Sequence, residues 1–321
     1  MRPLAALFSN HKVLLLLTVL LVLSAILSTA AVARGGGQPF SFYVQQKQEQ
    51  QQQQTPLSQQ TPSPQENQGQ KALSEGQRAL IPEYKYFQEA GGTLELAHYD
   101  ARFFTAPIPY TTHRTILTHL IRSYLTTFAS LNLETWLAHG TLLGWYWNGR
   151  IMPWDFDVDA QVSGTTLAIL AEQHNGSVHT YTAHTNPTTG QEENRTYLLD
   201  VNPFATRVGW GRGENFIDAR WIDVETGMFV DITGLVERDP RGQPGVWSCK
   251  NYHGYRPEEL FPLRETEFEG VPAMVPWEYE GVLVGEYGEK SLVVTEWEGH
   301  RWDPDSKEWV KMNETETEEV L

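Results

Sequence analysis

The chain has 321 residues, with 24 Lys and Arg against 40 Asp and Glu, and a formal net charge of −16 at pH 7. This acidity argues against a nucleic-acid partner, because phosphate backbones are bound by basic patches. Cys249 is the only cysteine, which excludes an internal disulfide and a cysteine-rich metal site.

The N-terminal region carries an uncharged apolar run over residues 13–33, about the 20 residues that a helix needs to cross a bilayer. Arg2 and Lys12 precede the run, which predicts a cytosolic tail over 1–12 and a lumenal body. The stretch Ala31–Ala33 also resembles a signal-peptidase site, so a cleaved signal peptide is the alternative. We expect a single-pass type II membrane protein, or a secreted one if the segment is cleaved.

A Gln- and Pro-rich region over residues 34–79 follows the apolar run. It has too little apolar surface to offset the entropy of ordering, which predicts a disordered stalk. Residues 80–310 are enough for one large domain with a hydrophobic core. The end of the chain, residues 311–321, is predicted to be an acidic, frayed tail.

The first predicted helix of the folded part begins at Arg114, where apolar side chains recur at helical spacing up to about Leu133. The stretch "ETWLAHG" predicts a short strand that ends at Gly140. The stretch "TLLGWYWNG" predicts a short helix closed by Gly149, since glycine tolerates the left-handed conformation common at helix ends.

An acidic run follows, in which Asp155, Asp157 and Asp159 alternate with Phe156 and Val158. On a strand, this spacing would send all three carboxylates to one face and the apolar side chains to the other.

The second half of the domain returns to strand patterns. Residues 164–174 predict a helix, and the polar, turn-rich residues 175–194 predict a surface insertion. A strand is expected over 195–203, and a hairpin over 220–234 around Glu-Thr-Gly. After Val236, many Pro, Gly and aromatic residues predict irregular structure with short helices. This order of elements predicts an α+β (α/β-like) domain with a mixed sheet and flanking helices.

The acidic run predicts a metal site, with a solvated acidic face as the alternative. Like charges side by side on a sheet are destabilising unless a cation or protons neutralise them. Carboxylates and substrate phosphates are the usual ligands of Mg²⁺, and Mn²⁺ has similar preferences. An EF-hand is excluded, because Ala160 and Thr166 stand where that loop needs Gly and Glu. The DxD motif of metal-dependent glycosyltransferases stays open on spacing alone.

The acidic run is part of "PWDFDVD" at Pro153–Asp159, and two further features accompany it: "GTLLG" at Gly140–Gly144 and "FVDITG" around Asp231. Together they resemble the LicD family of the nucleotidyltransferase superfamily, which includes fukutin-related proteins and fungal mannosyl-phosphorylation proteins. The resemblance extends from about Tyr110 to Leu292, and implies a nucleotidyltransferase-like fold for a catalytic domain.

The resemblance also implies roles for individual residues. Asp157, Asp159 and Asp231 would hold one or two Mg²⁺ or Mn²⁺ ions. Asp155 would be a further ligand or orient a water, and Asp155 or Asp231 could accept the proton of a sugar hydroxyl.

Other residues are candidates for binding the donor. A glycine and a hydroxyl at a helix start suit a phosphate, which makes Gly140 and Thr141 the predicted donor phosphate site. Weaker candidates are aromatic residues for stacking or core packing, a histidine beside the turn, and arginines for phosphate: Trp145, Tyr146, Trp147, His139, Arg150, Arg256 and Arg264.

For the fungal branch, the resemblance implies transfer of mannose 1-phosphate from GDP-mannose to a hydroxyl of an N- or O-linked mannan glycan, with release of GMP. CDP-linked donors are the sibling possibility. A non-catalytic regulator of a partner transferase and a metal-dependent glycosyltransferase that releases GDP are the alternatives. We expect a Golgi location, with glycans on the sequons at Asn175, Asn194 and Asn313.

Overall fold

The computed structural model describes residues 84–185, 192–207 and 215–312. The segments predicted as cytosolic tail, membrane helix and stalk fall outside these ranges, as does the sequon at Asn313. Within the described ranges, no helix has the length and apolar character that a membrane span requires.

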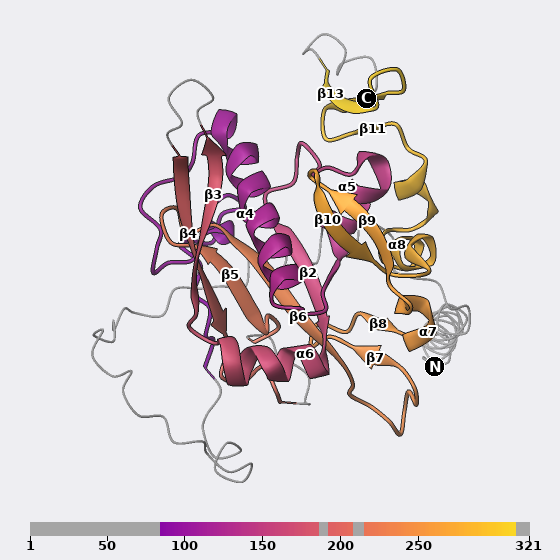
Figure 1. Cartoon of the computed structure of the whole chain (residues 1–321). Coiled ribbons are helices and arrows are strands. Elements are labelled where there is room, and N and C mark those ends of the chain that lie inside the picture. The colour runs from indigo at the N-terminus through magenta and orange to yellow at the C-terminus, as the bar shows by residue number, and fades with distance from the viewer. Residues whose placement is uncertain (1–83, 186–191, 208–214, 313–321) are drawn as a thin grey trace, which may run out of the picture.

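The main sheet is mixed, as predicted, with the strand order β1-β2-β6-β5-β4-β3 (Figure 1). Strands β2 and β6 run parallel, and the other neighbours in this order are antiparallel. Short strand β7 extends the sheet from β6 and pairs with β8. The strands are β1 (Trp136–Leu137), β2 (Val158–Ser163), β3 (Val178–Thr185), β4 (Glu192–Val201), β5 (Ala219–Asp223), β6 (Phe229–Glu237), β7 (Trp247–Ser248) and β8 (Gly254–Tyr255).

Helix α4 (Tyr110–Ser130) lies across one face of this sheet. Its apolar side chains, including Leu120 and Tyr124, are fully buried, because the helical spacing gathers them on the side that faces the strands. Trp221 of β5 packs beneath the helix and donates a hydrogen bond from Nε1 to Ser123 Oγ at 2.9 Å. The predicted helix is confirmed, with a start just after Pro109.

Helix α5 (His139–Asn148) confirms the predicted short helix, and Gly149 ends it in the left-handed region at φ 72°. The prediction of a strand up to Gly140 is wrong, because β1 ends at Leu137 and the helix already begins at His139. Gly144 is required by the fold, since a β-carbon there would lie 2.4 Å from the Arg150 carbonyl oxygen.

The elements after the acidic run are partly as predicted. Helix α6 (Gly164–Ile169) continues into a π-helix over Leu170–His174, and β5 and β6 form the predicted hairpin. The surface insertion predicted over 175–194 is wrong in its described part, because it contributes β3 and the start of β4, which pair with each other. Strand β3 is at the edge of the sheet with β4 beside it, and the polar side chains of this pair suit a face in contact with solvent.

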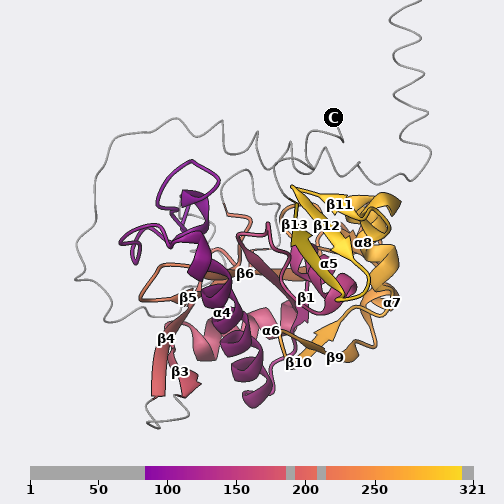
Figure 2. The same ribbon diagram turned by 90° about the horizontal axis from the view of Figure 1, so that it is seen from above.

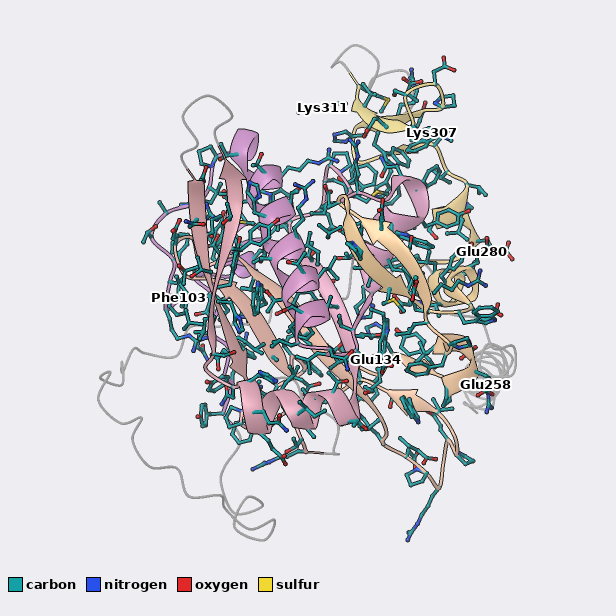
Figure 3. All side chains as sticks on the ribbon, viewed as in Figure 1. Phe103, Glu134, Glu258, Glu280, Lys307 and Lys311 are labelled. Carbon is teal, nitrogen blue, oxygen red and sulfur yellow. The ribbon has the colours of Figure 1, made fainter. Side chains whose placement is uncertain are left out.

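Residues 257–311 form a second group of elements beside the main sheet (Figures 1 and 2). It contains more strands than the irregular structure we predicted. Trp302 and Trp309 of this group pack against Trp147 of α5, and side chains fill the group throughout (Figure 3). Its elements are α7 (Pro257–Leu260), β9 (Arg264–Phe268), β10 (Val271–Val275), α8 (Tyr279–Tyr287), η3 (Glu289–Leu292), β11 (Glu296–Trp297), β12 (His300–Asp303) and β13 (Glu308–Lys311).

Candidate functional site

A row of charged residues crosses the main sheet on the face away from α4. Residues Asp200, Arg220, Asp231 and Asp159 are successive register partners on β4, β5, β6 and β2. Register partners share a face, and their chain neighbours point to the other face. Because Trp221, the neighbour of Arg220, packs under α4, the charged row faces the opposite side.

Asp159 and Asp231 stand side by side on the parallel strands β2 and β6. The Asp159 backbone N–H donates to Thr141 Oγ1 at 2.8 Å, so the start of α5 is tied to β2 at this residue. Thr141 is only 2% exposed. Its hydroxyl therefore supports the acidic strand, and its predicted contact with a donor phosphate stays a prediction.

Arg220 neutralises part of this row. Its Nε donates to Asp231 Oδ1 at 2.8 Å and its Nη2 to Glu89 Oε1 at 3.0 Å. The guanidinium is buried, with its carbon 3.6 Å from the ring centroid of Phe229 and 4.7 Å from that of Phe87. Burial raises the pKa of the Asp231 carboxyl, Arg220 opposes that rise, and the negative charge of Asp157 adds to it. Asp157 therefore lies close enough to Asp231 for their charges to interact.

Asp157 immediately precedes β2 rather than lying within it. One of its carboxylate oxygens, Oδ2, is 3.5 Å from Nε2 of His98, and both side chains are nearly buried. Asp159 and Asp231 are register partners near the start of the two parallel strands, and Asp157 directly precedes β2.

Of the three aspartates only Asp159 lies on β2, so the prediction that one strand carries all three is wrong, and Asp155 lies in the preceding turn. Its N–H donates to the Met152 carbonyl at 3.1 Å in a turn, so the extended strand begins only at Val158. A β-carbon on Gly140 would lie 2.8 Å from Asp155 Oδ2. The glycine thus leaves room for a carboxylate at the start of α5, where the helix dipole favours negative charge. Whether a donor phosphate also binds at Gly140 stays a prediction.

A buried polar cluster lies behind this turn. His139 has φ 52°, an uncommon backbone conformation for a residue with a side chain. Its Nδ1 is 2.9 Å from Glu286 Oε2 of α8, and the Tyr255 hydroxyl donates to the other oxygen of Glu286. The His253 ring lies 4.4 Å from that of His139.

The tautomer of His139 follows from its neighbours. Gln161 Oε1 accepts from Trp136 Nε1, an atom that can only donate, so the Gln161 amide nitrogen must face His139 Nε2, 3.5 Å away. His139 Nε2 is then an acceptor, and Nδ1–H donates to Glu286. His139 thus anchors the start of α5 to α8.

The acidic residues have the oxygen donors that Mg²⁺ or Mn²⁺ prefers. In residues 84–185, 192–207 and 215–312, however, no three His, Cys, Asp or Glu side chains are grouped so as to hold a metal ion. Asp231 faces the guanidinium of Arg220 and Asp157 faces the ring of His98, so side chains of the protein already contact two of the three predicted ligands.

The aromatic residues that were candidates for stacking on the donor pack against the protein core in this structure. Trp145 Nε1 donates to Thr266 Oγ1 at 2.9 Å and Trp147 Nε1 to the Ser291 carbonyl at 3.1 Å. Tyr146 lies 6.1 Å from the Trp147 ring. All three side chains are partly buried against the C-terminal group.

The three candidate arginines contact residues outside the row of charged residues. Arg150 pairs with Glu308, and Arg264 lies over the exposed ring of Trp277. Arg256 is the N-cap residue of α7. The sequon residues Asn175 and Asn194 are exposed, which is compatible with glycans that stay a prediction.

Sequence reasoning missed Arg220 and the N-terminal residues His98 and Glu89. Arg220 sits one position before Trp221 in the predicted hairpin, so alternation could have placed it on the face of Asp231. No sequence signal pointed to His98 or Glu89, because their position depends on how residues 84–109 cross the sheet.

Comparison with known proteins shows what this domain is similar to. Residues 132–278 match the family described as LicD/FKTN/FKRP, nucleotidyltransferase domain. In Saccharomyces cerevisiae, Mannosyltransferase regulator 4 is 36% identical over 158 residues, and Mannosyltransferase regulator 14 is 36% identical over 162 residues. Each match covers 47% of this chain, and it spans 13% and 16% of the two relatives' own lengths.

Proposed function

Because residues 132–278 form a LicD-family nucleotidyltransferase domain, we propose that this protein acts in mannosylphosphorylation. It would transfer mannose 1-phosphate from GDP-mannose to a hydroxyl of a mannan glycan and release GMP. The names of the yeast relatives support a role connected with mannosyl transfer.

The observation that carries the proposal is the pairing of Asp159 and Asp231 on adjacent parallel strands, with Asp157 at the entrance to the same strands. These carboxylates lie on the face that α4 leaves uncovered. The turn at Gly140 and Thr141 is tied to this face through the Asp159 N–H. The beginning of the parallel strands β2 and β6 thus combines several carboxylates with the start of α5.

The proposal includes a divalent cation, Mg²⁺ or Mn²⁺. The row is acidic and the donor diphosphate is an anion, so the two would repel each other without a cation between them. Asp157, Asp159 and Asp231 are the candidates to hold it, although the described structure does not group them around one point, and the ion would stabilise negative charge on the phosphates.

The proposed acceptor step needs a base for the sugar hydroxyl. Burial raises the pKa of Asp231, which makes this carboxylate a better proton acceptor than an ordinary aspartate. Asp155 is the other candidate. Its place beside Gly140 puts it at the start of α5 rather than in the charged row.

A second function is favoured by a specific observation, namely the ion pair between Arg220 and Asp231. An arginine that holds one of the predicted ligands, together with relatives named regulators, supports a non-catalytic regulator of a mannosylphosphate transferase. A glycosyltransferase that moves the sugar without its phosphate is the third alternative.

The identity of the released nucleotide distinguishes the mannosylphosphate transferase, the regulator and the glycosyltransferase. The purified chain is incubated with GDP-mannose, MnCl₂ and a mannan oligosaccharide, and the nucleotide products are resolved by chromatography. Asp159→Asn tests the row, and Asp305→Asn, an exposed residue of the β12–β13 turn, is the matched control.

The transferase proposal predicts manganese-dependent GMP and a mannosylphosphate adduct with the wild type and Asp305→Asn, and a loss of at least about 100-fold with Asp159→Asn. GDP in place of GMP would indicate a glycosyltransferase. Absence of turnover with GDP-mannose and CDP-linked donors would contradict the transferase and favour the regulator.

A further inference from the structure

The site extends beyond the matched family domain into the segment that precedes α4. Residues 84–109 run beside β5 and β6 (Figure 2) and contain the 3₁₀ turn η1 (Leu96–His98). This segment ends more than twenty residues before the matched domain begins at residue 132. It nevertheless places His98 next to Asp157, and Glu89 where it accepts a hydrogen bond from Arg220.

Backbone contacts fix this segment on the sheet. Asp100 N–H donates to the Gly227 carbonyl at 2.8 Å, and Tyr99 forms an isolated β-bridge with Met228. Gly227 has φ 82°, and a β-carbon there would lie 3.0 Å from Phe104 N. The turn between β5 and β6 is thus shaped to receive the residues directly after His98.

The His98 ring is held by two contacts. It stacks on Phe156, with the centroids 6.2 Å apart and the planes at 18°, and its Nε2 is 3.5 Å from Asp157 Oδ2. His98 is 8% exposed, and its Nδ1 is buried without a hydrogen-bond partner among the described residues. Asp157 is therefore the group toward which the polar edge of this ring is directed.

The contact between His98 and Asp157 determines which nitrogen of the His98 ring carries the hydrogen. A carboxylate oxygen only accepts, so the His98 nitrogen that faces it must carry a proton. An N–H on Nε2 points its hydrogen at the Asp157 carboxylate and limits the rotation of that group. The ring of His113 also packs on Phe156, with the centroids 5.2 Å apart and the planes at 62°.

We propose that His98 is a positioning residue that orients the Asp157 carboxylate for donor binding, so that the segment before α4 is part of the site. This inference rests on the proposed function. His98 acts through Asp157, in the way that residues around metal or phosphate ligands orient those ligands.

Two substitutions separate positioning from packing. His98→Phe keeps an aromatic ring against Phe156 and removes the N–H, whereas His98→Gln keeps a side-chain N–H near the Nε2 position and removes the ring. His179→Phe is the control, because that ring also packs on an aromatic side chain, Trp221 at 5.0 Å, but contacts none of the site residues above.

The measurement is the affinity of the purified chain for GDP-mannose in MnCl₂, by titration calorimetry, with the unfolding midpoint of each variant beside it. We expect about tenfold weaker binding for His98→Phe, affinity within about threefold of wild type for His98→Gln, and no change for His179→Phe. If His98→Phe instead bound the donor like the wild type and His98→Gln bound it more weakly, His98 would act by packing, and the inference would be overturned.

A wild type that binds no GDP-mannose would count against the proposed function rather than against His98. The pair is then tested by unfolding His98→Phe, Asp157→Asn and the double variant. If the shift in the midpoint of the double variant differs from the sum of the two single shifts, the contact between the two side chains is supported. If it equals that sum, the contact is overturned.

Discussion

The hydroxyl of Thr141 is the smallest feature that connects the glycine turn to the acidic strand. It accepts the Asp159 N–H and is buried. Replacement by valine keeps the shape of the side chain but leaves that N–H without a partner, which costs about 1–3 kcal/mol. We therefore expect Thr141→Val to lower the free energy of unfolding by this amount in urea titrations.

Thr141→Ser is the matched control, because it keeps the hydroxyl and loses one methyl group, worth about 0.8 kcal/mol. Serine as destabilising as valine, or more so, would show that Thr141 acts by packing. That result would contradict the hydrogen bond to Asp159 as the connection between α5 and β2.

Two buried histidines predict how stability depends on pH. Burial lowers the pKa of His253 to about 4, and that of His113 to about 4 as well. The unfolded chain, with histidine near its ordinary pKa of about 6.5, therefore binds more protons than the folded chain between these values. Stability should fall as the pH is lowered through this window and level off below it.

Each histidine contributes a slope of up to about 1.4 kcal/mol per pH unit. Urea unfolding between pH 4 and pH 7.5 measures this slope for the wild type and for His253→Gln, which cannot titrate there. The variant should show a shallower dependence. An equal slope in both proteins would mean that His253 is not held neutral in the fold.

At the scale of elements, Glu286 connects α8 to the start of α5. Its two oxygens accept from His139 Nδ1 and the Tyr255 hydroxyl, and its side chain is 6% exposed. These neighbours lower the pKa of Glu286 against the effect of its burial, so the group stays charged at neutral pH. The anchor supports the left-handed backbone of His139, which costs of the order of 1–3 kcal/mol.

Glu286→Gln replaces one acceptor oxygen with an amide that cannot accept. We expect it to lower the free energy of unfolding by about 1–3 kcal/mol in denaturant titrations, because a buried donor loses its partner. Glu280→Gln is the control on the same helix, since Glu280 is exposed and points away from the molecule (Figure 3). Equal, small effects of both changes would contradict the anchor.

At the scale of the whole molecule, several elements of the fold could be predicted from the spacing of apolar residues and from the residues at turns. Helix α4, helix α5 with its glycine end, and the β5–β6 hairpin follow from local patterns that the structure confirms. Asp159 and Asp231 are brought together as the family resemblance implied. The mixed sheet followed from the order of these elements.

The remainder depends on long-range contacts that local patterns do not contain. Asp155 left the strand because a turn at Met152 and the space beside Gly140 gave its carboxylate another position. The β11–β13 strands are short, and tryptophans packed on α5 hold them in place rather than a strong strand pattern. His98 and Glu89 became site residues only through the path of residues 84–109 across the sheet, whereas Arg220 lies opposite Asp231 in the β5–β6 pairing.

The central claim is that the carboxylates on the face away from α4 bind the nucleotide-sugar donor. Its most direct test is equilibrium binding of GDP-mannose to the purified chain, with and without MnCl₂, for the wild type, Asp159→Asn and Asp305→Asn. We predict manganese-dependent binding for the wild type and Asp305→Asn, and at least about tenfold weaker binding for Asp159→Asn. Equal affinity of Asp159→Asn and the wild type would contradict the claim, and so would a wild type that does not bind the donor.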